Sequence, residues 1–351
     1  PIIALISGMF MWLVAFLICA VQGVELPNLN WLLADAQHYA SIKEEGYQSH
    51  FLAAFFPLFP FLWRILGVSA MGMGMLNAGL FIGGAGLLGS TFKLPMKYFL
   101  LYCCLPMNVF FFLPYSESIF AFAMILVLIG MFKWNWLLMI AGVIICSFAR
   151  PTAALLIPAL VLATALVNEP REVKKKMTLL PISAGLTFFS VLLVQSIETG
   201  SLFTFFEAQE SWGSHWRIPK LPLSTWGSSF NLSLDGLALF FALISGVGFL
   251  MAIKKKIPLS MIEWFSLAFI GGTGLLVVLT RGGELYSLSR FVYCVPVFPF
   301  AMAVLFKEGV VPKRLFMICL AILPWFFGIH VHIQAVVGGF TLIALLMIFS
   351  Y

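Results

Sequence analysis

Charged residues are scarce in this sequence. Aspartate, glutamate, lysine and arginine make up 10% of the 351 residues, whereas 62% are hydrophobic and the mean hydropathy is +1.05. Soluble globular domains carry about 25% charged residues, so this scarcity excludes a soluble globule. The apolar runs are about 20 residues long, which is the length a helix needs to cross a hydrocarbon core of about 30 Å. We therefore predict an all-α, polytopic membrane protein.

The sequence also lacks the cysteine and glycine patterns of common cofactor sites. Its six cysteines all lie inside apolar runs without metal-ligand spacing, which favours packing over disulfides or metal binding. No lysine follows the glycine-rich stretch 71–89 in the manner of a phosphate-binding loop. Gly79 and Gly83 instead have the small-xxx-small spacing that lets helices approach closely. We expect no metal site and no cofactor, and the metal dependence stays open.

Eleven or twelve membrane-spanning helices are predicted, the number depending on the last two. They cover residues 2–21, 70–90, 98–114, 117–133, 135–149, 152–168, 178–197, 231–251, 261–280, 291–306, 315–330 and 332–351. Residues 51–68 are also apolar but contain Pro57 and Pro60, which interrupt a regular helix. This segment is predicted to be an interfacial or partly re-entrant element.

The basic residues are unevenly distributed among the loops. Thirteen of the twenty lie in residues 91–97, 133, 168–176, 252–256 and 307–314, which predicts that these loops are cytoplasmic. The loops that then face outwards carry nine acidic residues and comprise residues 22–69, 114–117, 198–230 and 281–290. The net charge of +6 therefore indicates topology and contact with anionic membrane lipids, and no nucleic-acid partner is expected.

The densest polar stretch, ADAQHYASIKEEGYQ at 34–48, lies in the first outward loop. Together with AFFPLFP (54–60), PMNVFFFLPYSESIFAF (106–122) and FARPTAALL (148–156), it resembles the PIG-V family of membrane mannosyltransferases, which have the GT-C glycosyltransferase fold. FFEAQESWGSHW (205–216) and SLSRFVYCVPVFP (287–299) are looser matches. The chain departs from the family at Ala34, where a tryptophan is usual, and at Pro151 and Thr152. Its shorter outer loops indicate a bacterial homologue.

The resemblance implies a single GT-C domain over residues 1–351, in which residues 22–69 form the catalytic loop and residues 198–230 a second outer loop. It also implies an inverting mannosyltransferase whose donor is a polyprenyl- or dolichyl-phosphate mannose and whose acceptor is lipid-linked or a glycolipid. Such an enzyme is expected in the bacterial cytoplasmic membrane with its active site outwards, or in the endoplasmic reticulum with a lumenal site.

Asp35 is the expected catalytic base, because the resemblance points to it and direct displacement needs one carboxylate. The structural alternative is that Asp35 caps a helix that begins at Ala36. His38 and Tyr39 follow by three and four residues, so one helical turn stacks them over Asp35, where they contact the donor phosphate or orient the base. For His38, a purely interfacial role stays open.

The other expected site residues are cations, sugar contacts and aromatics near the outer face. The donor phosphate is assigned to Arg150, Arg281 and Arg290, with snorkelling to lipid headgroups as the alternative. Tyr115 and Glu117 are expected beside the donor, although a carboxylate at a helix start also favours the helix dipole. The acceptor is assigned to residues that also suit an interfacial aromatic belt: Gln209, Trp212, His215 and Trp216.

Two other functions stay open. A glycolipid transporter or flippase would place charges at the membrane midplane and show internal repeats, but the polar residues gather at one face and no second copy of the 34–60 unit is found. The sequence does not separate an enzyme from a non-catalytic subunit of a glycosylation complex.

Overall fold

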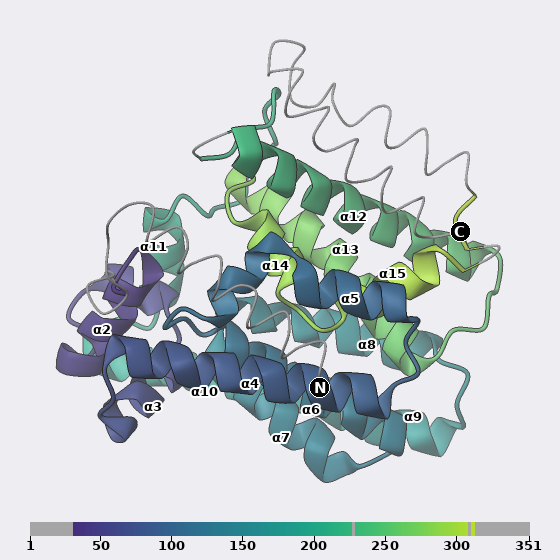
Figure 1. Cartoon of the computed structure of the whole chain (residues 1–351), viewed down its shortest axis with the longest axis horizontal. Coiled ribbons are helices and arrows are strands. Elements are labelled where there is room, and N and C mark those ends of the chain that lie inside the picture. The colour runs from purple at the N-terminus through teal and green to yellow at the C-terminus, as the bar shows by residue number, and fades with distance from the viewer. Residues whose placement is uncertain (1–30, 227–228, 308–309, 313–351) are drawn as a thin grey trace. The chain divides into compact units, whose positions relative to one another are not determined.

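The described chain is all-α. The structure, a computed structural model, describes residues 31–226, 229–307 and 310–312. These residues form 14 α-helices, α2 to α15, and three short 3-10 helices (Figure 1). Over the same residues there is no strand, and β-type pairing is limited to one isolated bridge between Ser224 and Glu284.

The described residues form two compact units, which are described separately. Unit 1 holds residues 31–94, 99–154 and 182–212, and unit 2 holds residues 95–98, 155–181, 213–226, 229–307 and 310–312. The single domain expected over residues 1–351 stays a prediction.

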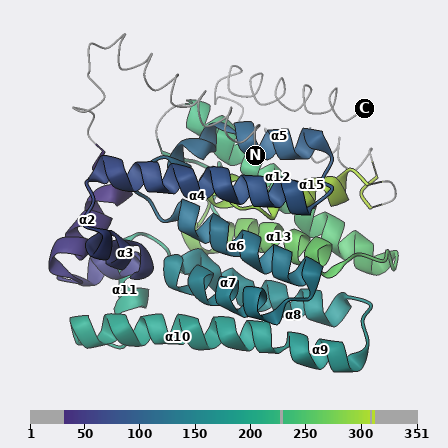
Figure 2. The same ribbon diagram turned by 60° about the horizontal axis from the view of Figure 1, so that its bottom comes forward.

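Unit 1 contains most of the N-terminal helices. Its elements are α2 (Asp35–Glu45), η2 (His50–Ala54), α3 (Leu58–Leu66), α4 (Ala70–Thr91), most of α5 (Met96–Cys104), η3 (Pro106–Phe111), α6 (Glu117–Lys133), α7 (Trp136–Ala149), most of η4 (Pro151–Leu155), most of α10 (Leu179–Thr199) and α11 (Thr204–Ser211). Figure 2 shows α4, α6 and α7 lying side by side, and α4 and α7 both pack on α6.

α6 and α7 pack closely against each other in unit 1. A Cβ atom on Gly142 would lie 2.6 Å from the carbonyl oxygen of Ala123, so the two backbones touch at a glycine. Asn135 begins α7 by accepting a hydrogen bond from the Leu138 amide at 3.2 Å. The α6–α7 hairpin therefore has its turn near Lys133 and its open end at Glu117 and Arg150.

The close approach expected in the glycine-rich helix is seen among the described residues, but not at Gly79 and Gly83. No described atom would lie within 4 Å of a Cβ on either residue. Gly74, earlier in the same helix, makes the contact instead, because a Cβ there would lie 2.6 Å from the Phe112 carbonyl oxygen. Small-residue spacing marks a face that can pack closely but does not say which turn is used.

Unit 2 is built on a pair of long helices. Its elements are α8 (Leu156–Leu166), α9 (Arg171–Met177), α12 (Ser229–Lys254), α13 (Met261–Arg281), α14 (Leu288–Tyr293) and α15 (Phe298–Leu305). α13 packs against both α12 and α8 (Figure 1). A capping box begins α13: Ser260 accepts from the Glu263 amide at 3.3 Å, and the Glu263 carboxylate accepts from the Ser260 amide at 2.7 Å.

Four helices in the described residues are long and apolar enough to cross a membrane, which indicates a multi-pass membrane protein. They are Ala70–Thr91, Arg171–Thr199, Leu234–Lys254 and Met261–Arg281, and they correspond to the predicted spans 70–90, 178–197, 231–251 and 261–280. Predicted spans 117–133 and 135–149 are helices of 17 and 14 residues. Fourteen residues reach only about 21 Å, less than the hydrocarbon thickness.

Two predicted spans are broken rather than continuous. Segment 98–114 divides into α5 and η3. Segment 291–306 becomes α14 and α15 with a break at residues 294–297. Pro106 and Pro296 lie at these breaks and lack the amide that a continuous helix requires. Segment 152–168 is helical without a break, since η4 leads directly into α8 and the two cover Pro151–Leu166. Spans 2–21, 315–330 and 332–351 fall outside the described residues.

Residues 51–68 form short helices, as the two prolines predict. The segment contains most of η2 and all of α3, and Pro57 immediately precedes α3. Phe61 and Ile65 on α3 are 58% and 63% exposed, so the outer side of this helix is apolar. The structure thus has no continuous helix here, and contact of α3 with a bilayer stays a prediction.

Candidate functional site

Asp35 is the first residue of α2. The expected alternative, a helix that begins at Ala36 with Asp35 as its cap, is wrong: the N-cap is Ala34, and Asp35 lies in the first turn. A carboxylate there is stabilised by the helix dipole. Ala34 has φ 46°, an unfavourable conformation for a residue with a Cβ atom. The Tyr115 hydroxyl donates to the neighbouring Leu33 carbonyl at 3.0 Å and helps to hold this entry to the helix.

His38 lies one helical turn after Asp35, and both side chains are half-buried. Burial lowers the pKa of the His38 imidazole, and the Asp35 carboxylate opposes this shift by raising the pKa. His38 also contacts three aromatic rings, with centroid distances of 4.9 Å to Phe55, 5.4 Å to Phe51 and 5.5 Å to Trp212. A neutral imidazole beside a carboxylate can both donate and accept a hydrogen bond.

Tyr39 points inwards from α2. It is 3% exposed, and its hydroxyl lies 2.7 Å from the Ser116 hydroxyl at the start of α6. Burial, followed by the nearby Glu117 carboxylate, raises the pKa of Tyr39 well above its usual value, so the phenol stays protonated. Tyr39 therefore ties α2 to α6 instead of lining the exposed side of α2.

Glu117 and Arg150 form a buried ion pair at the open end of the α6–α7 hairpin. Arg150 Nη1 lies 2.5 Å from Glu117 Oε1, and the two residues are 7% and 0% exposed. The Arg150 guanidinium also lies 6.0 Å from the Phe120 ring centroid. Because Arg150 is buried in unit 1, snorkelling to headgroups does not describe it. Its charge is already compensated by a carboxylate.

An aromatic wall, which we define as Phe51, Phe55 and Trp212, faces His38. Phe51 and Trp212 stack with a centroid distance of 4.3 Å and an interplanar angle of 24°. The Trp212 indole also donates to the Phe51 carbonyl at 3.2 Å. Trp212 directly follows α11, and Gln209 lies half-buried on that helix. Two segments far apart in sequence thus meet beside α2.

Unit 2 holds a second polar cluster. Arg281 lies 3.9 Å from the Tyr286 ring centroid and donates a hydrogen bond to the Tyr286 carbonyl. Asp235 accepts from the Thr225 hydroxyl at 2.6 Å and from the Ser289 amide at 2.8 Å. Arg290, the next residue, is 7% exposed.

The expected site residues divide between the units. Unit 1 contains Asp35, His38, Tyr39, Tyr115, Glu117, Arg150, Gln209 and Trp212, and unit 2 contains Arg281, Arg290, His215 and Trp216. The last two are exposed, and the His215 amide donates to the Thr280 carbonyl at 2.8 Å.

Sequence reasoning missed the partners of several site residues. Asp235 carried a usable signal, since a lone carboxylate in an apolar helix is expensive and is expected to have partners. Phe51 and Ser116 carried none, because their contacts with Trp212 and Tyr39 join distant segments.

Neither a metal centre nor a known relative identifies this site. Within the described ranges, no three histidine, cysteine, aspartate or glutamate side chains are grouped so as to hold a metal ion. The chain matches no protein-family model, no curated protein and no solved structure.

Proposed function

We propose that this protein is a membrane glycosyltransferase of the GT-C type. The donor is a polyprenyl-phosphate sugar, with mannose favoured by the resemblance to the PIG-V family, and the acceptor is a lipid-borne hydroxyl at the outer face. One observation carries the proposal: the half-buried Asp35 carboxylate lies on α2 beside His38, whose imidazole faces the aromatic wall.

Asp35 acts as the general base in this proposal. It takes the proton of the acceptor hydroxyl while the hydroxyl oxygen attacks the anomeric carbon of the sugar. The bond from that carbon to the phosphate oxygen breaks, and its electron pair leaves with the polyprenyl phosphate. A single displacement inverts the anomeric configuration. His38, held in the neutral form by burial, hydrogen-bonds a sugar or phosphate oxygen.

The aromatic wall supplies the binding surface. Trp212 is half-buried, so part of its indole is open to a ligand. Flat aromatic faces of this kind bury the apolar side of a sugar ring, whereas the Asp35 side of the site supplies polar contacts.

Arg150 has a structural role in this proposal and does not contact the substrate. The Tyr39–Ser116 hydrogen bond ties α2 to the start of α6, and the ion pair of Arg150 with Glu117 joins α7 to α6 at the same end of the hairpin. Because the Arg150 guanidinium already forms an ion pair with Glu117, direct binding of a phosphate by Arg150 would require this ion pair to break. Arg281 and Arg290 keep their expected phosphate role as a prediction.

Sugar transfer by the purified protein tests the proposal. With a polyprenyl-phosphate mannose donor and a glycolipid acceptor, the wild type is expected to turn over, and Asp35→Asn is expected to lose about 10²- to 10⁴-fold in rate because the amide cannot accept the proton. Glu45→Gln is the matched control, an exposed carboxylate at the other end of α2. Near-normal turnover by folded Asp35→Asn protein contradicts the base role. Glycolipid movement across vesicles without any transfer would favour the transporter.

The proposed orientation has its own test. Cysteines introduced at Ser49 and Lys175, both exposed, are expected to label from opposite sides of intact cells, with Ser49 reached from outside. Cys104 is an exposed native thiol and is first replaced by serine. Outside labelling at both positions would reverse the assignment of the basic loops and remove the reason for a lipid-borne donor.

A further inference from the structure

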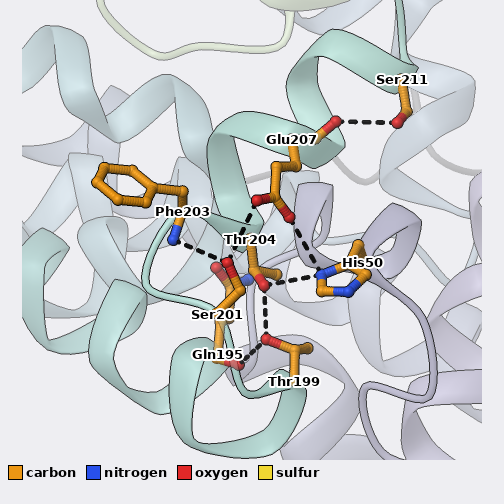
Figure 3. Close-up of polar contacts among 8 residues, drawn as sticks. All are labelled: His50, Gln195, Thr199, Ser201, Phe203, Thr204, Glu207 and Ser211. Carbon is orange, nitrogen blue, oxygen red and sulfur yellow. Dashed lines mark hydrogen bonds and ion pairs between the residues drawn. The ribbon is translucent and has the colours of Figure 1, made fainter.

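A polar cluster joins η2 to α11 in unit 1 (Figure 3). Its His50 directly precedes Phe51 of the aromatic wall in the sequence. His50 Nδ1 lies 3.0 Å from the Thr204 hydroxyl and 3.3 Å from Glu207 Oε2. The Thr204 hydroxyl is also 2.6 Å from the Thr199 hydroxyl, and Ser201 donates to Glu207 Oε1 at 3.2 Å. Thr204 is 1% exposed, whereas the side chains of His50 and Glu207 are 53% and 49% exposed. Neither the resemblance nor the proposed chemistry uses this cluster.

The hydrogen atoms in the cluster can be counted. The Thr199 hydroxyl donates its single hydrogen to the Gln195 carbonyl at 2.7 Å. The Thr199 hydroxyl can then only accept a hydrogen bond from Thr204, so the Thr204 hydroxyl donates its single hydrogen to Thr199. The contact between Thr204 and His50 therefore requires His50 Nδ1 to carry a hydrogen and donate it. Glu207, which as a carboxylate only accepts, faces the same nitrogen.

The cluster and the aromatic wall hold opposite ends of the same short helix. Thr204 begins α11, and Trp212 directly follows its last residue. His50 and Phe51 are consecutive on η2 and contact these two ends respectively. Helices as short as α11 are not stable alone, so tertiary contacts set the position of α11.

We propose that His50 is a positioning residue that fixes the Phe51–Trp212 stack opposite His38 and thereby controls acceptor binding. This inference rests on the proposed function for its effect on substrate, but the positioning itself is a property of unit 1. The Nδ1 hydrogen bond to the buried Thr204 hydroxyl carries the effect, because a half-exposed ion pair such as His50–Glu207 contributes little.

The amide analogues of histidine provide a matched pair. Asparagine places an amide nitrogen at the position of histidine Nδ1, and glutamine places it at the position of Nε2. His50→Asn is therefore expected to keep the bond to Thr204, and His50→Gln is expected to lose it. Thr204→Ser and Thr204→Val form a second pair, since only serine keeps the hydroxyl.

The first measurement does not depend on enzymatic activity. Iodide quenching of Trp212 fluorescence, obtained by difference from Trp212→Phe, is expected to increase in His50→Gln and Thr204→Val and to stay at the wild-type level in His50→Asn and Thr204→Ser. Equal quenching in both members of each pair would overturn the positioning role. If His50→Gln fails to fold while His50→Asn folds, the threonine pair decides.

The second measurement is sugar transfer. His50→Gln is expected to raise KM for the acceptor about fivefold, the effect of one ordinary hydrogen bond, with kcat within about twofold of the wild type. Glu210→Gln, an exposed position on α11, is the control and should change neither. A fall in kcat with unchanged KM would overturn the role in acceptor binding. If quenching differs within each pair as expected but neither the wild type nor any variant transfers sugar, the positioning role is upheld and the glycosyltransferase is rejected.

Discussion

The two units contain arginines, the buried Arg150 and the half-buried Arg281, that are stabilised in different ways. In unit 1, Arg150 pairs with the fully buried Glu117 carboxylate at 2.5 Å. In unit 2, Arg281 lies over the Tyr286 ring and donates to the carbonyl of the same residue. Tyr286 is in turn stacked on Trp226 with a centroid distance of 4.2 Å. One guanidinium is in direct contact with an opposite charge, whereas the other contacts the neutral ring and carbonyl of Tyr286, and the Asp235 and Glu284 carboxylates act on it electrostatically.

This difference determines what remains after a substitution. Removal of either partner in unit 1 leaves a buried charge without its counter-charge. Removal of Arg281 in unit 2 leaves a neutral ring and a neutral carbonyl in contact, and the Asp235 and Glu284 carboxylates lose one nearby cation. The same residue type is therefore expected to differ in its effect on stability between the units.

Glu117→Gln is expected to have the largest effect on stability. It leaves the Arg150 guanidinium buried and charged, which costs about 3–5 kcal/mol in the free energy of unfolding. Arg150→Met is expected to cost less, because the remaining carboxyl group can become neutral by taking up a proton, whereas arginine stays charged. Reversible unfolding in mixed detergent measures both variants.

The double variant Glu117→Leu, Arg150→Met is the control for this pair. Replacement of both charges by apolar groups of similar volume is expected to recover much of the lost stability. If the double variant is as unstable as the sum of the single ones, the comparison fails for unit 1, because the two charges then do not compensate each other.

Arg281→Gln is expected to have a smaller effect. Loss of the cation above the Tyr286 ring reduces the free energy of unfolding by about 1–2 kcal/mol. Arg281→Lys keeps the charge but loses the planar fork, so it is expected to recover only part of the loss. A double-mutant cycle with Tyr286→Leu measures the coupling of the two side chains. A loss as large as that of Glu117→Gln would show that Arg281 also depends on a counter-charge and would remove the contrast between the units.

The helices could be predicted from local sequence to a large extent. The apolar runs 117–133 and 261–280 match α6 and α13 closely, because Lys133 and the Ser260 capping box mark real helix ends. Prediction failed at segments 98–114 and 291–306, where hydropathy stays high across Pro106 and Pro296 although the helix is broken. Hydropathy indicates which residues avoid water but is insensitive to the loss of single backbone hydrogen bonds.

The site could be predicted only where it is local. Asp35 and His38 are one helical turn apart, so their spacing was enough to place them together. Tyr39 follows the same spacing, yet burial against Ser116 turned it inwards. The Glu117–Arg150 pair requires two helices to form a hairpin, which no single-sequence spacing encodes.

The smallest expected effect is the pH dependence that His38 adds to unit 1. Burial lowers the pKa of His38 below its ordinary 6.5, so the unfolded chain binds the proton more readily than the folded chain. The neutral imidazole is therefore fully compatible with folding above pH 6.5, and stability is lost as the pH falls below that value towards the lowered pKa. Thermal unfolding at pH 7.5 and pH 5 measures this loss, which is expected to be smaller in His38→Phe than in the wild type. Asp35→Asn removes the carboxylate that opposes the shift, so it is expected to increase the loss at pH 5. An equal acid loss in His38→Phe and the wild type would assign the pH dependence to other groups and leave the burial of His38 without this consequence.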